Sequence, residues 1–209
     1  MITQLTRIDL LFHVIDILEK CDVPYCLVEG TLLGMMRENG FISWDKDIDI
    51  GVRHEDLIPK MPQLQKIFSA CFSVHVLDFP YPYPREFHLN ARGYQIDIIN
   101  YDVGTYNGQP VRFNVIHDQY ASSYHAADLF ESYKPFKFLG RTFYLPKDPE
   151  RYLIETYGHE WQTPLKPGKY IAYPIIPGWF EEQKIMDVDA INNWHIKHNS
   201  NGSPKQEEK

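Results

Sequence analysis

Residues 29–51 read EGTLLGMMRENGFISWDKDIDIG, and the rest of the chain is organised around them. Three aspartates fall at alternate positions near the end of this stretch: Asp45, Asp47 and Asp49. Successive side chains of a strand point to opposite faces, so Asp47 and Asp49 project from one face while Ile48 and Ile50 enter the core. The spacing therefore predicts a buried strand with an acidic face.

The acidic face predicts a metal site. Two carboxylates this close repel each other, and a cation normally holds such a pair together. Hard oxygen ligands in a small cluster suit Mg²⁺ or Mn²⁺ that bridges to substrate phosphates. Upstream we expect a strand over 25–28, a Gly30-Thr31 turn and a helix from Leu32 to Glu38. That geometry offers backbone N–H groups to a phosphate, so Gly30 and Thr31 are candidate phosphate contacts.

A third carboxylate, Asp97, lies in a second predicted strand. Segments 86–91 and 94–101 are typical of a hairpin around Arg92-Gly93, and Asp97 alternates with isoleucines in the second segment. Phosphoryl transfer depends mainly on positioning and charge neutralisation, which two-metal sites supply. Asp47 and Asp49 would hold the metal against a substrate diphosphate. Asp97 would share a second metal or accept the proton of an attacking hydroxyl.

Three further residues near these carboxylates have two interpretations each. Arg37 either contacts the diphosphate or forms an ion pair that steadies the aspartate strand, with Asp45 as a candidate partner. Asp45 either supports the metal ligands from behind or caps the turn after Trp44. His88, on a strand close to Asp97, is a candidate site residue. The favoured interpretation is a histidine of the core or rim whose hydrogen-bonding groups are satisfied.

The remaining pattern predicts further elements and one main domain over residues 1–180. An amphipathic helix is expected over 3–21, where apolar residues recur at three- and four-residue steps. The other expected elements are a helix opening at 54, a strand over 72–77, an irregular proline-rich loop over 78–84, a weak helix over 120–133, a hairpin over 136–145 turning at Gly140-Arg141 and a helix over 150–157. A helix over 181–198 and a disordered tail over 199–209 complete the chain.

Composition excludes several classes of protein. The net charge of −7 over 209 residues argues against nucleic-acid binding through phosphate neutralisation. The three cysteines form no metal-type pair, which indicates buried thiols in a reducing compartment. The apolar run 8–18 is interrupted by Asp9, His13 and Asp16, so it predicts neither a signal peptide nor a membrane span. A cytoplasmic protein is the expectation.

Residues 29–51 resemble the LicD and fukutin-related family, whose pattern is approximately GGTLLG-x-x-R-x-x-G-x-IPWD-x-D-x-D-x-G. Tyr152-Leu153 and Tyr157-Gly158, followed by Trp161 and Pro164, are similar to the family's C-terminal YL…YG…W…P element. The resemblance covers roughly residues 5 to 165. Glu29 stands where a first glycine is common, Ser43 stands where proline precedes Trp-Asp, and the Cys/His zinc insertion of some animal members is not found.

The resemblance implies an α+β protein of the nucleotidyltransferase (DNA polymerase β-like) fold, with a mixed sheet and flanking helices. It implies a Mg²⁺- or Mn²⁺-dependent transferase that moves a phospho-alcohol, such as phosphocholine or ribitol phosphate, from a CDP-linked donor to a sugar hydroxyl. Such glycan modification belongs to lipopolysaccharide or teichoic acid biosynthesis. By position, Gly30 and Thr31 match the nucleotide-binding turn, Asp47 and Asp49 the metal pair, and Asp97 the third carboxylate.

Two alternatives remain at this point. The same carboxylates serve a true nucleotidyltransferase, which transfers a nucleoside monophosphate from a nucleoside triphosphate. A non-catalytic nucleotide-binding module is the other, and the three intact aspartates argue against it. Glu29 bears on the phosphate contacts, because an anion beside a diphosphate is unfavourable unless it points away.

Overall fold

The computed structural model describes residues 6–77, 86–106, 108–116 and 121–164. Seven strands form one sheet, in the order β1-β2-β5-β4-β3, with β6 on the far part of β5 and β7 on β6. Strands β8 and β9 form a separate hairpin. The strands are β1 Cys26–Leu27, β2 Asp47–Arg53, β3 Ser73–Leu77, β4 Glu86–Ala91, β5 Tyr94–Tyr106, β6 Gln109–Ile116, β7 Ala121–Ala126, β8 Tyr133–Phe138 and β9 Arg141–Pro146.

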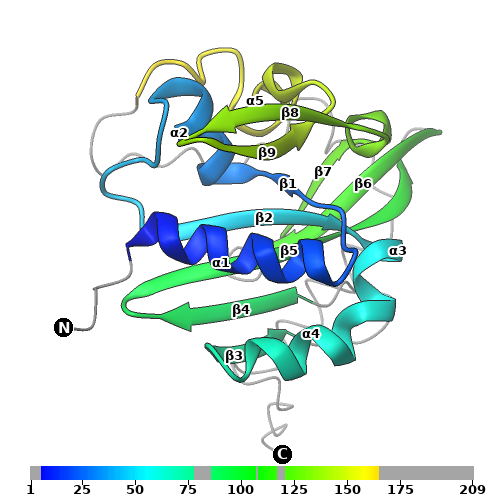
Figure 1. Cartoon of the computed structure of the whole chain (residues 1–209). Helices are drawn as coiled ribbons and strands as arrows, with labels where there is room; N and C mark the ends of the chain where they lie inside the picture. The colour runs from blue at the N-terminus through cyan, green and yellow to red at the C-terminus, as the bar shows by residue number, and fades with distance from the viewer. Residues whose placement is uncertain (1–5, 78–85, 107, 117–120, 165–209) are drawn as a thin grey trace, which may run out of the picture.

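The helices flank this sheet (Figure 1). They are α1 Arg7–Lys20, α2 Glu29–Arg37, α3 His54–Leu57, η1 Ile58–Lys60, α4 Met61–Phe68, η3 Ala127–Phe130 and α5 Pro149–Tyr157. In Figure 1, α1 runs in front of β5, with β2 above it and β4 below it, while α2 and the β8–β9 hairpin lie beside β1 at the top. The predicted α+β class with a mixed sheet and flanking helices is confirmed.

The centre of the sheet is the parallel pair β2 and β5. Ile48 pairs with Ile96, and Ile50 pairs with Ile98. All four isoleucines are fully buried, as the alternation predicts. Every other strand pair of the described sheet is antiparallel. The isoleucine core thus fixes the register in which the aspartates of β2 meet those of β5.

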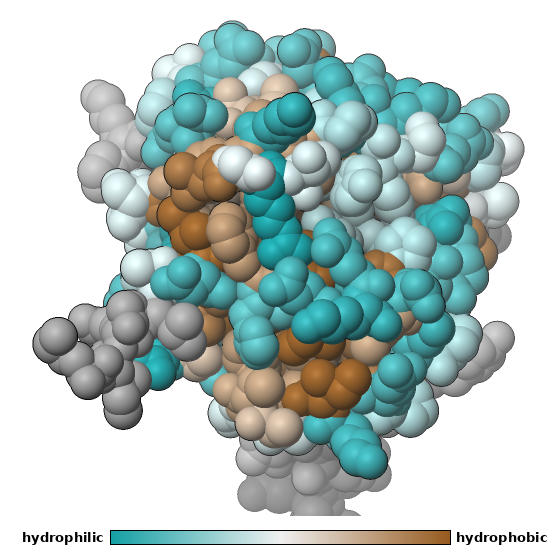
Figure 2. Space-filling model, viewed as in Figure 1, coloured by the Kyte–Doolittle hydropathy of each residue, from teal (hydrophilic) through white to brown (hydrophobic). Residues whose placement is uncertain are grey.

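Helix α1 begins with a capping box. The Thr6 hydroxyl accepts from the Asp9 backbone N–H, and the Asp9 carboxylate accepts from the Thr6 N–H. The buried stripe of α1 packs into the core, and its outer face is polar. In Figure 2 a mostly hydrophilic band crosses the middle of the molecule where α1 lies. The predicted amphipathic helix is confirmed, with its described bounds inside the expected ones.

The predicted hairpins and the helix opening at 54 are also confirmed. The β4–β5 turn has positive φ at Arg92 (54°) and Gly93 (84°), which fits a tight hairpin. The β8–β9 turn falls at Leu139 and Gly140 (φ 47° and 77°), one residue before the predicted position, and Arg141 opens β9. Helix α5 ends at Gly158, whose φ is 79°.

Two structural expectations outside the 29–51 stretch are wrong. The helix expected over 120–133 is not found in residues 121–133, because 121–126 form β7 against β6 and 127–130 form a 3₁₀ turn. Cys71 is exposed, whereas the other two cysteines are buried. The proline-rich loop 78–84, the helix 181–198 and the tail 199–209 lie outside the described residues. No described helix has the length and apolarity needed to cross a membrane.

Candidate active site

Asp49 and Asp97 occupy directly paired positions of β2 and β5. Paired residues of neighbouring strands project from the same face of a sheet, and neighbouring strands lie about 4.8 Å apart. Asp47 is two residues before Asp49 and shares its face; it pairs with Gln95. The predicted placement of the third carboxylate on a strand beside the aspartate strand is confirmed.

Thr31 holds Asp49 from the start of α2. The Thr31 backbone N–H donates to Asp49 Oδ2 (3.1 Å), and the Asp49 N–H donates to Thr31 Oγ1 (2.8 Å). The expected Gly30-Thr31 turn is wrong in one respect, because α2 begins at Glu29 and both residues lie in its first helical turn. A helix leaves its first N–H groups without internal partners, and here a carboxylate from β2 takes one of them.

Charge accumulates around Asp49. Its side chain is buried, and burial, with the further repulsion of Asp97, Glu29 and Asp45, raises its pKa well above the ordinary value. The Thr31 N–H acts in the opposite direction and is the weaker influence. Without a cation, Asp49 therefore retains a proton to a higher pH than an ordinary aspartate.

Gly30 allows two carboxylates to reach the same place. A Cβ at residue 30 would lie 2.9 Å from Asp45 Oδ2 and 3.2 Å from Asp49 Oδ2. Asp45 precedes β2, and its Oδ1 accepts from the Asp47 N–H (3.2 Å). It therefore caps the turn that leads into the strand, as one of its two interpretations proposed, and its other oxygen faces the site.

Arg7 is a structural residue of this site that sequence reasoning missed. Its guanidinium donates to the backbone carbonyls of Ile42 (3.1 Å), Asp45 (2.8 Å) and Asp47. It also forms an ion pair with the Asp45 carboxylate (3.7 Å) and stacks on Phe41, 4.1 Å from the ring centroid. The available signal was an arginine on the apolar stripe of a helix, one turn before Leu11.

Asp97 belongs to a polar chain on β4 and β5. The Gln95 side-chain amide donates to Asp97 Oδ2 (2.9 Å). His88 lies between two acids, with Nδ1 3.7 Å from Asp97 Oδ1 and Nε2 3.8 Å from Glu86 Oε2. Burial raises the pKa of Glu86 to about 7. His88 is thus a half-buried histidine with acidic partners on both sides, and Glu86 is a second residue that sequence reasoning missed.

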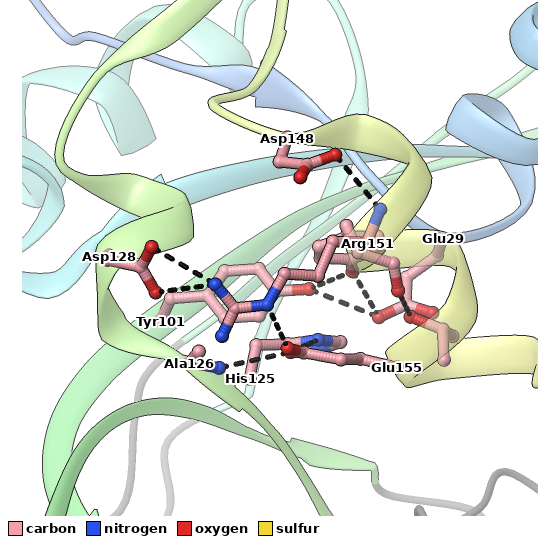
Figure 3. Close-up of polar contacts among 10 residues, drawn as sticks. Glu29, Tyr101, His125, Ala126, Asp128, Asp148, Arg151 and Glu155 are labelled. Carbon is pink, nitrogen blue, oxygen red and sulfur yellow. Dashed lines mark hydrogen bonds and ion pairs between the residues drawn. The ribbon is translucent and has the colours of Figure 1, made fainter.

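The Glu29 side chain points into a cluster of tyrosines and makes its hydrogen bonds there. Its Oε1 accepts from the hydroxyls of Tyr101 (3.1 Å) and Tyr152 (2.8 Å), which lie 2.8 Å from each other. Figure 3 shows Glu29 and Tyr101 meeting beside α5. The φ of Glu29 is 45°, a region that glycine adopts more readily. The side chain therefore compensates for a backbone better suited to the family's glycine.

The same close-up shows how α5 is fastened to its neighbours. Arg151 donates to Glu155 (2.9 Å) and Asp128 (3.1 Å), and Glu155 accepts from the Ala126 N–H (3.1 Å) (Figure 3). His125 stacks on Tyr152 with their rings 4.2 Å apart and nearly parallel. The YL…YG segment thus reaches Glu29, the first residue of the 29–51 stretch, through Tyr152.

At the other end of α2, Arg37 connects the 29–51 stretch with the C-terminal YL…YG…W…P element. Its Nη1 donates to the Trp161 carbonyl (3.4 Å), and its Nη2 pairs with Glu38 (2.8 Å). The ion-pair partner of Asp45 is Arg7 rather than Arg37. Contact between Arg37 and a diphosphate stays a prediction.

The carboxylate oxygens of the site are suitable ligands for a divalent cation. Within the described ranges, no group of three His, Cys, Asp or Glu side chains is arranged to hold a metal ion. Asp47, Asp49 and Asp97 nevertheless share one sheet face, and carboxylate oxygens are the ligands that Mg²⁺ and Mn²⁺ prefer. The repulsion that raises the pKa of Asp49 is an excess of negative charge that a cation would neutralise.

Comparison with known proteins gives consistent results. Residues 22–148 match the family described as LicD/FKTN/FKRP, nucleotidyltransferase domain. The chain is 37% identical over 68 residues to an uncharacterised protein of Rickettsia typhi, covering 27% of this chain and 22% of that protein. It is 36% identical over 53 residues to the lipopolysaccharide cholinephosphotransferase LicD of Haemophilus influenzae, covering 25% of this chain and 20% of that protein.

A human protein is similar over a shorter stretch. The ribitol 5-phosphate transferase FKRP of Homo sapiens is 42% identical over 45 residues, which are 22% of this chain and 9% of that protein. The chain matches about a fifth or less of the length of these curated relatives. The family match, by contrast, spans more than half of the present sequence and includes β1 to β9. The chain therefore belongs to the LicD/FKTN/FKRP family.

Proposed function

We propose that this protein is a metal-dependent transferase that moves a phospho-alcohol from a CDP-linked donor to a sugar hydroxyl of a glycan or glycan precursor. The observation that carries the proposal is the pairing of Asp49 with Asp97, with Thr31 holding Asp49 at the start of α2. The LicD and FKRP relatives are named as cholinephosphotransferase and ribitol 5-phosphate transferase, which supports this reaction class.

The chain's own residues have distinct tasks in this reaction. Asp47 and Asp49 would hold Mg²⁺ or Mn²⁺, and the hydrogen bonds from Thr31 fix the position of Asp49. Gly30, in the first turn of α2, presents its backbone to the donor diphosphate without a side chain in the way. Arg37, at the far end of the same helix, is the candidate cation for the outer phosphate oxygens.

Asp97 accepts the proton of the acceptor hydroxyl, or shares a second cation. The hydroxyl oxygen bonds to the phosphorus that carries the alcohol, and the bond from that phosphorus to CMP breaks, so CMP leaves. The bound cation supplies neutralisation of the charge on the phosphoryl oxygens. The Gln95 amide and the His88 ring hold Asp97 in place, and Glu86 contacts the other side of the His88 ring.

Donor turnover tests this proposal against nucleotidyl transfer. The full-length protein is incubated with Mg²⁺ and CDP-choline labelled in the choline phosphate, and separately with labelled CTP or ATP. Release of CMP from CDP-choline, lost in Asp49→Asn, is the expected result. Transfer of a nucleoside monophosphate from CTP or ATP would overturn it in favour of a true nucleotidyltransferase. Calorimetry that detects no Mg²⁺-dependent nucleotide binding would instead favour a non-catalytic module.

The donor series refines the proposal. CDP-choline is the first donor to test, since LicD is named for choline phosphate, and CDP-ribitol is the second, since FKRP is named for ribitol 5-phosphate. The acceptor belongs to a glycan such as that of lipopolysaccharide or teichoic acid, and the reaction takes place in the cytoplasm.

A further inference from the structure

A pocket of about 850 Å³ lies beside the aspartate strand, between the start of α1, the loop before β2 and the β4–β5 turn. A second hollow of about 450 Å³ adjoins it, and Asp47 and Gln95 are part of its lining. Both hollows are lined by Lys46, Arg92 and Tyr94. The two therefore form one continuous recess that begins at Trp44 and reaches the first aspartate of β2.

Two cations stand at the junction of these hollows. Lys46 and Arg92 are exposed, and neither forms an ion pair with a carboxylate of the described ranges. Asp45, which lines the larger hollow with them, is already paired with Arg7. In a protein with a net charge of −7, two exposed cations beside a pocket that have no ion-pair partner among the described residues favour an anionic ligand.

The wall of the pocket is aromatic. Trp44 leaves 72% of its surface exposed, the largest exposed fraction among the large apolar residues that the structure describes. Tyr94, the first residue of β5, also lines the pocket. An indole combines a flat apolar face with a polar N–H, so an exposed one beside a pocket suits a ligand with a ring and polar substituents.

We propose that this recess is the acceptor site and that it binds a sugar carrying an anionic group such as a phosphate. The sugar ring lies on Trp44, the anionic group lies between Lys46 and Arg92, and a free hydroxyl points toward Asp47. The assignment of the ligand as acceptor rests on the proposed function, since the donor diphosphate occupies the Gly30–Thr31 side of the aspartates. Asp47 lines the second hollow, whereas Gly30 and Thr31 line neither hollow.

Binding of a defined probe tests the site without any turnover. The intact protein is titrated with glucose 1-phosphate, methyl glucoside, inorganic phosphate and CMP, followed by saturation-transfer NMR and tryptophan fluorescence. Glucose 1-phosphate is expected to bind more tightly than methyl glucoside or inorganic phosphate. Lys46→Ala and Arg92→Ala are each expected to weaken it about two- to fivefold, as expected for one exposed ion pair. Trp44→Ala is expected to weaken it as well.

Lys134→Ala is the matched control, since Lys134 is an exposed lysine on β8 and does not line either hollow. Equal affinity for glucose 1-phosphate in Lys46→Ala, Arg92→Ala and Lys134→Ala would overturn the proposal. So would inorganic phosphate binding as tightly as the sugar phosphate, because the ring would then contribute nothing. Loss of CMP binding in the Lys46 and Arg92 variants would reassign the recess to the nucleotide.

A kinetic arm separates this inference from the proposed function. With CDP-choline as donor and a glycan phosphate as acceptor, Lys46→Ala is expected to raise the KM for the acceptor and to leave the KM for CDP-choline unchanged. A rise in the KM for CDP-choline alone would overturn the acceptor assignment. If CDP-choline is not turned over by the wild type, the proposed reaction fails, while the glucose 1-phosphate titration still decides whether the recess binds sugar phosphates.

Discussion

Asp49 and Asp97 project side by side from β2 and β5, and their mutual repulsion is one reason that the pKa of Asp49 is raised. Such a pair destabilises the fold when no cation is bound. Under the proposed function a cation would offset the repulsion, so substitution of these residues would affect stability and activity in opposite directions.

Asp49→Asn is expected to lower transferase activity by more than about a hundredfold, a larger loss than that of an outer partner of a metal ligand. The Tm of the metal-free protein is expected to stay unchanged or rise, because an amide keeps the acceptor for the Thr31 N–H and removes the repulsion. Activity assays and thermal unfolding in EDTA measure the two effects. A drop in Tm would show that Asp49 serves the fold rather than the cation.

Arg7→Met is expected to destabilise the protein by about 2–4 kcal/mol, because three backbone carbonyls and the Asp45 carboxylate lose a buried charged donor. Arg7→Lys keeps the positive charge but loses the forked guanidinium that donates to several acceptors. Its stability is expected to lie between those of the wild type and Arg7→Met. Urea unfolding measures the change. Lys20→Met, an exposed position on the same helix, is the control and is expected to change stability by less than about 0.5 kcal/mol.

Glu29→Gly has two opposed effects. Glycine relieves about 1 kcal/mol of strain at a φ of 45°, but Tyr101 and Tyr152 lose a charged acceptor worth about 2–3 kcal/mol. The net expectation is a loss of about 1–2 kcal/mol in unfolding free energy. In a Tyr152→Phe background the loss is expected to shrink, since the two side chains share one interaction. An equal loss in both backgrounds would contradict this account.

Glu86→Gln tests the buried acid of β4. The pKa of Glu86 is about 7 in the fold, above its ordinary value of 4.5, so burial favours the neutral form. The wild type is therefore most stable below pH 4.5 with respect to this group and loses stability as the pH rises to about 7. Over that pH interval the unfolding free energy of the variant is expected to rise relative to that of the wild type, by at most about 3 kcal/mol. Urea unfolding at pH 4.5, 6 and 8 measures the gain, with the exposed Glu150→Gln as control.

Gly34→Ala tests the close approach of α2 to the loop that leads into β2. A Cβ at Gly34 would lie 2.5 Å from the Gly40 carbonyl oxygen, so alanine is expected to cost about 1–3 kcal/mol despite its better helix propensity. Gly40→Ala is the matched control, since a Cβ there meets nothing within 4 Å, and it is expected to be neutral or slightly stabilising. Equal unfolding free energies for the two variants would show that the approach is not constrained.

The alternation of isoleucines with polar or acidic residues was enough to predict β2 and β5. It also predicted that their aspartates lie on neighbouring strands. The roles of Asp47, Asp49, Asp97, Gly30, Thr31 and Arg37 stay predictions. The start of α2 was placed too late, since a carboxylate from β2 supplies the cap that its own sequence lacks. Strand β7 was missed because its pairing with β6, and not a local pattern, decides its conformation.

Arg7 and Glu29 show the same limit at the site. Their partners are the carbonyls of residues 42–47 and the hydroxyls of β5 and α5, which lie far away along the chain. The sequence shows that both residues are unusual, since Arg7 lies on an apolar stripe and Glu29 replaces a glycine. It does not show which residues they contact. Long-range contacts of this kind become visible only when the sheet is assembled.

The parallel pairing of β2 with β5 has a consequence for the order in which the chain folds. Its hairpins close between neighbours in sequence, whereas β2 pairs with β5 only after the helices α3 and α4 and the strands β3 and β4, which lie between them in the chain. Contacts of such separation form late, because the entropy of closing the loop is lost first. We therefore expect the face of the sheet that carries Asp49 and Asp97 to be the last part of the sheet to form.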